Sequence, residues 1–84
     1  MSERQVLVKL YARASELAGL AETAVPVAGD ASAAAVKRAL ARQHPALGAL
    51  LASCVLATDA EFLSDEAAVG GATALHLVPP VSGG

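Results

Sequence analysis

Apolar and polar residues alternate in two segments, one near each end of the chain. Residues 5–11 and residues 73–78 both place every second side chain on the same face of an extended backbone. Alternation with a period of two is typical of a β-strand that buries one face. One face carries Val6, Val8 and Leu10 in the first segment and Leu75 and Leu77 in the second. The opposite face carries Leu7, Lys9, Tyr11, Ala74, His76 and Val78.

The main helix is predicted over residues 33–44, where apolar residues recur at helical spacing. Ser32 precedes this segment as an N-cap. Pro45 stops the helix, because a proline disfavours helical geometry in the residue before it. The residues expected on the apolar face are Val36, Leu40 and Leu47, and the basic residues left for solvent are Lys37, Arg38 and Arg42.

Shorter elements fill the rest of the chain. They are predicted as a helix over residues 12–19, strands over 23–28 and 54–58, a helical or irregular apolar segment over 46–52, an extended piece over 61–63, and turns at 29–30, 59–60 and 70–71. Leu17 anchors the first helix and Gly19 ends it, while Pro26 suggests that the second strand lies at a sheet edge. The order of elements predicts an α+β fold, with a small mixed sheet and one main helix packed across a face.

The composition indicates one small domain with an aliphatic core. A chain of 84 residues has room for a single core and little else. Alanine accounts for 21 residues, tryptophan is absent, and the aromatic residues are Tyr11 and Phe62. Charged residues make up only 17% of the chain, so some apolar surface is expected to stay exposed and to form a docking face.

Charge is unevenly distributed along the sequence. All six Lys and Arg residues lie before Gln43. The charged side chains after it are Asp59, Glu61, Asp65 and Glu66. This acidic half favours positively charged partners and argues against nucleic-acid binding, which needs clustered Lys or Arg. With no expected signal peptide or membrane span, and with Cys54 as the single cysteine, a cytoplasmic location is expected.

The last six residues are predicted to form an extended tail, residues 79–84, beyond a domain of residues 1–78. The two prolines at its start favour an extended path, and six residues reach at most about 20 Å. Gly83 and Gly84 have no side chains, so the reactive group that this end can present is the α-carboxylate of Gly84. The residues expected to thread into a partner are Pro79, Pro80, Val81 and Ser82. The alternative is a frayed terminus or an expression remnant.

Other side chains offer further candidates. Cys54 could hold a persulfide, but its apolar neighbours favour a buried filler. His44 is expected at a helix end and His76 is a candidate contact to a partner; with one cysteine they form no ligand set of zinc-binding spacing. Asp65 and Glu66 could form a carboxylate pair, but their context favours a solvated turn. The sequence shows no nucleophile with a nearby base and no phosphate-binding glycine loop. An independent enzyme is therefore not expected.

Four segments carry a resemblance to a known family. They are Val6-Leu7-Val8-Lys9-Leu10-Tyr11-Ala12, Glu16-Leu17-Ala18-Gly19, Arg42-Gln43-His44-Pro45 and Leu77-Val78-Pro79-Pro80-Val81-Ser82-Gly83-Gly84. With them the chain resembles the MoaD/ThiS-like family, and in particular the small, sulfur-carrying subunits of molybdopterin synthase. The tail is the most specific segment, since related thiamine-pathway carriers end in Gly-Gly without the Pro-Pro-Val-Ser lead. The resemblance implies a β-grasp, ubiquitin-like fold.

The resemblance also implies a mechanism. A partner similar to ubiquitin-activating enzymes uses ATP to adenylate the Gly84 carboxylate, and sulfur then displaces AMP to leave a thiocarboxylate. The tail enters the large synthase subunit, which holds the catalytic side chains, and delivers sulfur to a pterin precursor for the molybdenum cofactor. By this account the chain is a co-substrate and non-catalytic subunit that binds no cofactor or metal itself. The large-subunit pocket is expected to be basic.

The chain departs from the family pattern at Ser15, Asp59-Ala60, residues 70–73 and His76. Three alternative functions stay open. The chain could carry sulfur for thiamine or cysteine synthesis, or it could be a ubiquitin-like modifier that joins its terminus to lysines. It could also be a plain interaction module, which needs no free terminus.

Overall fold

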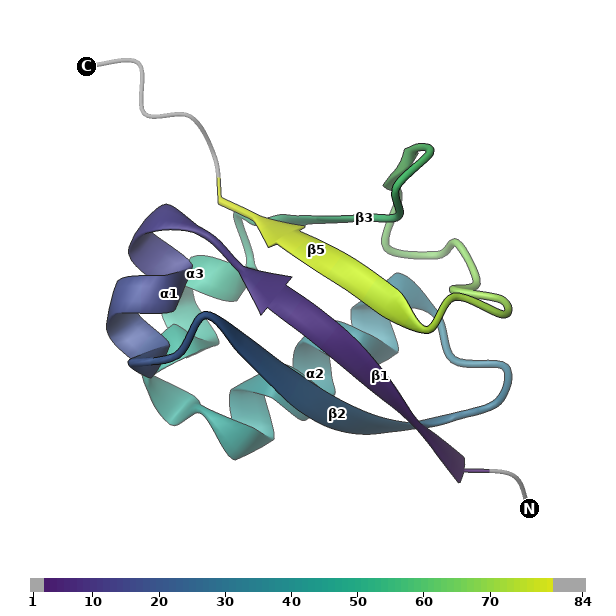
Figure 1. Ribbon diagram of the computed structural model, residues 1–84, viewed down its shortest axis with the longest axis horizontal. Helices are drawn as coiled ribbons and strands as arrows, with labels where there is room; N and C mark the ends of the chain where they lie inside the picture. Colours follow the sequence, from purple (N-terminus) through teal and green to yellow (C-terminus); the bar gives the residue numbers. More distant parts are fainter. Residues whose placement is uncertain (1–2, 80–84) are drawn as a thin grey trace.

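A five-stranded mixed sheet forms one layer of the protein, and helices form the other (Figure 1). The computed structural model describes residues 3–79 of the chain. Its elements are β1 (Glu3–Leu10), α1 (Ala12–Ala18), β2 (Glu22–Ala28), α2 (Ala33–Gln43), the 3₁₀ helix η1 (Pro45–Leu47), α3 (Gly48–Leu51), β3 (Val55–Ala57), β4 (Phe62–Leu63) and β5 (Ala74–Val78). The predicted elements are all present, although several boundaries differ by one or two residues.

The last strand of the chain lies in the centre of the sheet. The strand order is β2-β1-β5-β3-β4, in which β1 and β5 are parallel and the other neighbours are antiparallel. Strand β2 is therefore an edge strand, as Pro26 predicted, and this proline pairs with Gln5 on one side only. The two segments with the clearest alternation, β1 and β5, lie side by side with Leu10 opposite Leu77.

The helices begin and end where local chemistry allows. The Ser32 hydroxyl accepts a hydrogen bond of 3.2 Å from the backbone N–H of Ala35 and so caps α2. This helix ends at Gln43, one residue earlier than predicted, with His44 as its C-cap. Gly19 ends α1 in the left-handed conformation, with φ of 72°, and its N–H donates to the carbonyl oxygen of Ser15.

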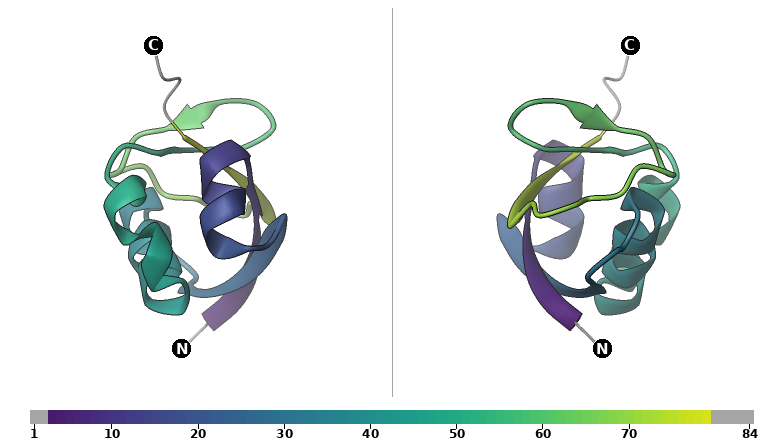
Figure 2. Two further views of the ribbon diagram at one scale, coloured as in Figure 1. Left: turned by 90° about the vertical axis from the view of Figure 1, so that its left-hand side faces the viewer. Right: turned by 90° about the vertical axis from the view of Figure 1, so that its right-hand side faces the viewer.

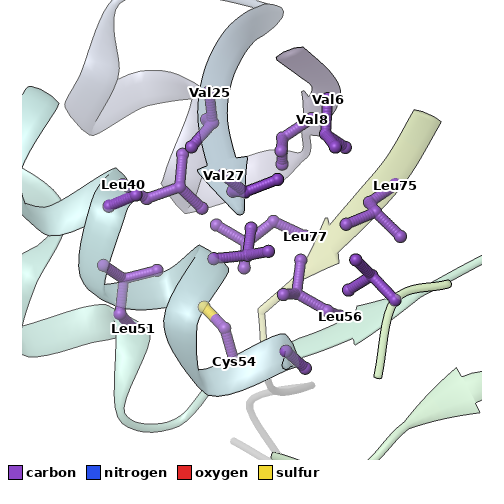
Figure 3. Close-up of a cluster of buried hydrophobic side chains, with 14 of the residues drawn as sticks. Val6, Val8, Val25, Val27, Leu40, Leu51, Cys54, Leu56, Leu75 and Leu77 are labelled. Carbon is purple, nitrogen blue, oxygen red and sulfur yellow. The ribbon is translucent and has the colours of Figure 1, made fainter. Parts of the chain in front are cut away.

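The core is aliphatic and lies between the sheet and the helices (Figure 3). The strand residues grouped on one face and the apolar residues grouped on the main helix are all buried: Val6, Val8, Leu10, Val36, Leu40, Leu47, Leu75 and Leu77. In α1 the fully buried residue is Ala14, whereas Leu17, the predicted anchor, is only partly buried against the core. The small alanine side chain allows this short helix to approach the rest of the core closely.

Lys37 contradicts the prediction that it is left for solvent. Its side chain is only 14% exposed, and its ammonium group lies 2.9 Å from the Asp65 carboxylate. The hydrocarbon stem of a lysine can lie along apolar surface while the charged end finds partners, so helical spacing alone misplaced it. Arg38 and Arg42 are exposed, as expected.

One face of the sheet has no helix on it. The two side views show α2 and α3 on one side of β1 and β5, and no described helix on the other (Figure 2). We call this uncovered side the open face.

The helices described within residues 3–79 are all too short or too polar to span a membrane.

Candidate functional site

The predicted tail starts at the end of the central strand. Strand β5 ends at Val78, where the predicted domain boundary falls, and Pro79 is the last described residue. The predictions for Pro80, Val81, Ser82, Gly83 and Gly84 lie outside the described residues and stay predictions.

The root of the tail is held on both sides. Strand β5 pairs with β1 along one edge and with β3 along the other. The turn that precedes β5 is fixed by Arg4, whose guanidinium donates to the carbonyl oxygens of Ala72, at 2.7 Å, and of Gly70. A chain that continues from Val78 therefore starts from a rigid base.

An apolar patch lies on the open face beside this root. We define the open-face patch as Tyr11, Val55, Phe62 and Val78. Tyr11, Phe62 and Val78 line one hollow with His76, and Val55 is the register neighbour of Val78. Phe62 is 71% exposed, Tyr11 42% and Val55 39%. A shallow hollow of about 450 Å³ is lined by Tyr11, Ala57, Thr58, Asp59, Phe62, His76 and Val78. Among the described residues, three of the four exposed large apolar side chains thus belong to this patch beside the last strand, and the fourth, Leu20, follows α1.

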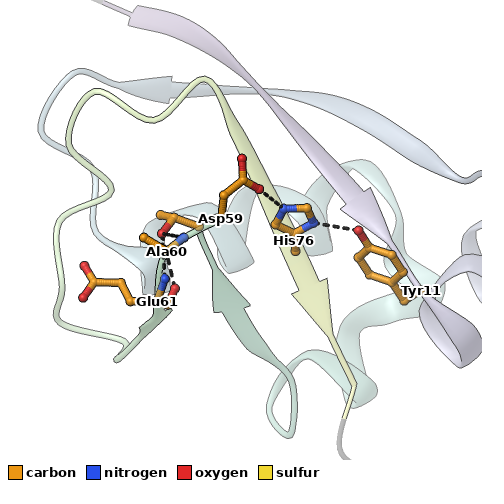
Figure 4. Close-up of polar contacts among 6 residues, drawn as sticks. Tyr11, Asp59, Ala60, Glu61 and His76 are labelled. Atoms are coloured by element: carbon orange, nitrogen blue, oxygen red, sulfur yellow. Dashed lines mark hydrogen bonds and ion pairs between the residues drawn. The ribbon is translucent and has the colours of Figure 1, made fainter.

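Three polar side chains cross this hollow as a connected chain (Figure 4). The Tyr11 hydroxyl lies 2.6 Å from Nδ1 of His76, and Nε2 of His76 lies 2.7 Å from a carboxylate oxygen of Asp59. The rings of Tyr11 and His76 also stack, with centroids 5.8 Å apart. With these two partners, the His76 imidazole is assigned the tautomer that donates from Nε2 to Asp59 and accepts from the Tyr11 hydroxyl at Nδ1.

A hydrogen-bonded turn holds Asp59 in this position. The Thr58 hydroxyl accepts hydrogen bonds of 3.1 Å from the backbone N–H groups of Ala60 and Glu61, and the Thr58 N–H donates to the Glu61 carbonyl. The turn predicted at residues 59–60 is present, and it aims the Asp59 side chain toward His76 (Figure 4). The Asp59 side chain remains 93% exposed, whereas that of His76 is 21% exposed.

Comparison with known proteins identifies the family. The sequence model of the ThiS family matches residues 8–84, which is nearly the whole chain. The chain belongs to the ThiS family. The Arabidopsis thaliana protein named molybdopterin synthase sulfur carrier subunit is 30% identical over 83 residues, which cover 99% of this chain and 86% of that one. The Chlamydomonas reinhardtii protein of the same name is 28% identical, covering 95% of this chain and 99% of that one.

A solved structure agrees with this assignment. The crystal structure of SAMP1 from Haloferax volcanii, a small archaeal modifier protein, is 30% identical and has a TM-score of 0.82, covering 96% of this ThiS-family chain and 100% of that one. The expected β-grasp, ubiquitin-like fold is therefore confirmed.

The other candidates in this ThiS-family chain have structural roles. Cys54 is buried, and burial raises the pKa of its thiol, against the smaller opposing effect of the Lys37 charge. His44 caps α2 and lies 3.2 Å from the Thr23 hydroxyl, apart from the Tyr11–His76–Asp59 chain. Asp65 and Glu66 are exposed in a turn, as predicted. In the described part of the ThiS-family chain, no three His, Cys, Asp or Glu side chains gather where a metal ion could bind.

Sequence reasoning singled out His76 but missed its two partners. Tyr11 follows β1, and Asp59 lies in the turn after β3, so neither is near His76 in the sequence. The signal that could have found them is the pairing of β5 with both β1 and β3. Once β5 is placed between them, Lys9 and Ala57 flank His76 in the register, and Tyr11 and Asp59 each lie two residues further on.

Proposed function

We propose that this chain is the sulfur-carrier subunit of molybdopterin synthase and that the carboxylate of Gly84 carries the sulfur. The observation that carries the proposal is the match to the ThiS family through to Gly84, on a sequence that continues directly from the central strand. Both plant and algal relatives bear this name and are matched over most of their length.

The chemistry begins with activation, because a free carboxylate is a poor electrophile. In this proposal the Gly84 carboxylate attacks the α-phosphate of ATP in an activating enzyme, which releases pyrophosphate and forms an acyl-adenylate. A sulfur nucleophile then displaces AMP and leaves a thiocarboxylate. When that sulfur passes to the pterin precursor, hydrolysis returns the terminus to a carboxylate, and the chain can be loaded again.

The contribution of this chain is positioning. A terminus tethered to a docked domain makes sulfur delivery effectively intramolecular, which lowers the entropic part of the barrier. The rigid base provided by β5 supports this role, since its hydrogen bonds to β1 and β3 fix where the tail starts. The catalytic side chains then belong to the large subunit, whose pocket must accept an anionic tail and a phosphate and is expected to be basic.

A ubiquitin-like modifier is the second candidate. The similarity to SAMP1, a small archaeal modifier protein, at 30% identity favours it as much as the curated relatives favour the carrier. Both functions use the same activated Gly84 carbonyl and differ in the acceptor, which is sulfur in one case and a lysine amine in the other. Sulfur delivery for thiamine or cysteine synthesis uses the same thiocarboxylate with a different receiving enzyme.

Intact-mass measurement of the natively expressed chain tests the proposal. We expect a species that ends at Gly84 with one oxygen replaced by sulfur, and its loss when the activating enzyme is deleted. The control variant carries one extra alanine after Gly84, which should fold normally but stay unloaded. A mature chain that continues past Gly84 would refute the carrier. Isopeptide conjugates to lysines, together with normal molybdopterin levels in a deletion strain, would favour the modifier.

A further inference from the structure

We propose that Asp59 is the recognition point for a cationic side chain, best an arginine, on the large subunit that receives the tail. In this proposal Tyr11 and His76 act as positioning residues that hold the Asp59 carboxylate in place. The inference rests on the proposed function, since it names how the partner of that same terminus is recognised.

The open-face patch has the character of an interface centre. Phe62, on the two-residue edge strand β4, exposes 71% of its surface and so contributes little to the core. Tyr11 and Val78 continue the apolar surface to the point where the chain leaves β5. Exposed aromatic side chains grouped in this way are typical of the residues that dominate binding energy when a partner covers them.

Most polar groups in the patch are already paired. The Tyr11 hydroxyl and both ring nitrogens of His76 have hydrogen-bond partners within 2.7 Å. A partner can cover these two side chains without leaving a donor of theirs unsatisfied, which removes much of the cost that buried polar groups usually carry.

Asp59 is the exception. Its Oδ1 accepts from His76, but among the described residues no hydrogen bond reaches its second oxygen. A carboxylate covered by an apolar surface loses its hydration and needs a charged or donating group in return. Arginine fits best, because its planar guanidinium can donate to a carboxylate while its flat face packs on an aromatic ring such as that of Phe62.

Charge around the patch favours this partner over a second copy of the chain. Asp59 and the exposed Glu61 lie together at the β3–β4 turn, and Lys9, the register neighbour of His76, forms no ion pair with Asp59. Two copies joined through this face would bring Asp59 and Glu61 of both chains together against one Lys9 from each, so the joined surface would carry net negative charge, which opposes association. A large subunit that takes the tail lies within about 20 Å of the end of β5, the reach of six extended residues, and so within range of this patch.

The test is the affinity of the purified large subunit for chain variants, measured by titration calorimetry at two salt concentrations. Asp59→Asn keeps the size of the side chain and removes its charge. We expect the large subunit to bind this variant at least about 30-fold more weakly, and the affinity to depend less on salt. Glu66→Gln, which removes an exposed charge elsewhere on the surface, is the matched control and should bind as the unaltered chain does. Thermal unfolding of each variant reports whether the fold is retained.

A double-mutant cycle tests the positioning role. His76→Ala should weaken binding in the unaltered chain but have little further effect once Asp59→Asn is present, because His76 acts through Asp59. Tyr11→Phe should give a smaller loss of the same kind. Additive effects of His76→Ala and Asp59→Asn would refute the positioning role.

The failure of this inference is distinguishable from the failure of the proposed function. If the large subunit binds the unaltered chain and Asp59→Asn equally well, the recognition point is wrong and the carrier function stands. If the large subunit does not bind the unaltered chain at all, the proposed function fails with it. Self-association of the chain in sedimentation experiments, abolished by Phe62→Ala, would assign the patch to a second copy and overturn the inference.

Discussion

The ammonium group of Lys37 donates a hydrogen bond of 2.6 Å to the carbonyl oxygen of Cys54 and so ties helix α2 to the residue before β3. The same group pairs with Asp65. Because Lys37 is largely buried, we expect Lys37→Met to destabilise the fold by about 1–2 kcal/mol, through a lost charged hydrogen bond that the methionine stem only partly offsets. Urea unfolding measures the change. Arg38→Met, at an exposed neighbouring position, should stay within about 0.5 kcal/mol.

Two glycines should respond to alanine in opposite directions. Gly19 has a φ of +72°, and no atom lies near an added Cβ, so the effect of a substitution comes from backbone strain alone. Gly19→Ala should lower the free energy of unfolding by roughly 1 kcal/mol. Gly48 begins α3 with helical angles of −49° and −51° and equally open space, so Gly48→Ala should stabilise by about 0.4–1 kcal/mol. Thermal melts of both variants check the pair, and equal effects would contradict the backbone argument.

Cys54 should resist thiol reagents until the protein unfolds. Burial raises the pKa of its thiol, so the folded state disfavours the reactive thiolate. The pKa of this thiol is therefore higher in the folded state than in the unfolded state. Its contribution to stability is fully present at pH below the unfolded-state pKa and is lost as the pH rises through the folded-state pKa. We therefore expect stability to fall in the alkaline range, and less steeply in Cys54→Ala. Urea titrations across that range, with labelling by a disulfide reagent, provide the measurement.

A bulky residue in place of Gly83 should separate folding from function. Gly83→Leu adds a side chain to a segment that the proposed function passes through a narrow channel, so sulfur loading or delivery should be lost. The unfolding midpoint should not change, because the last buried core residue of the described chain is Leu77. Intact mass and reconstituted molybdopterin synthesis distinguish the loading step from the delivery step. Normal turnover by this variant would contradict the threading of the tail.

The sequence predicted what local patterns determine. The alternation in β1 and β5, the Ser32 cap and the spacing of Val36 and Leu40 each depend on neighbouring residues, and each was confirmed. Pro26 indicated an edge strand because its missing N–H restricts where it can pair.

What could not be predicted depends on contacts between distant segments. The partial burial of Lys37 follows from Asp65, which is 28 residues away, and the partners of His76 are 65 and 17 residues away. No periodicity encodes these pairs, since they exist only once β5 lies between β1 and β3. The candidate site is therefore visible in the sequence as single residues, and the structure is needed to connect them.

Because β5 is central, the sheet cannot be completed until residues 74–78 have been synthesised. A growing chain can pair β1 with β2 early, but the middle of the sheet stays vacant until residues 74–78 have been made. Up to that point β1 and β3 expose unpaired edges, and a product truncated before β5 is prone to aggregation and degradation. We therefore expect chains that stop before β5 to be removed before they accumulate.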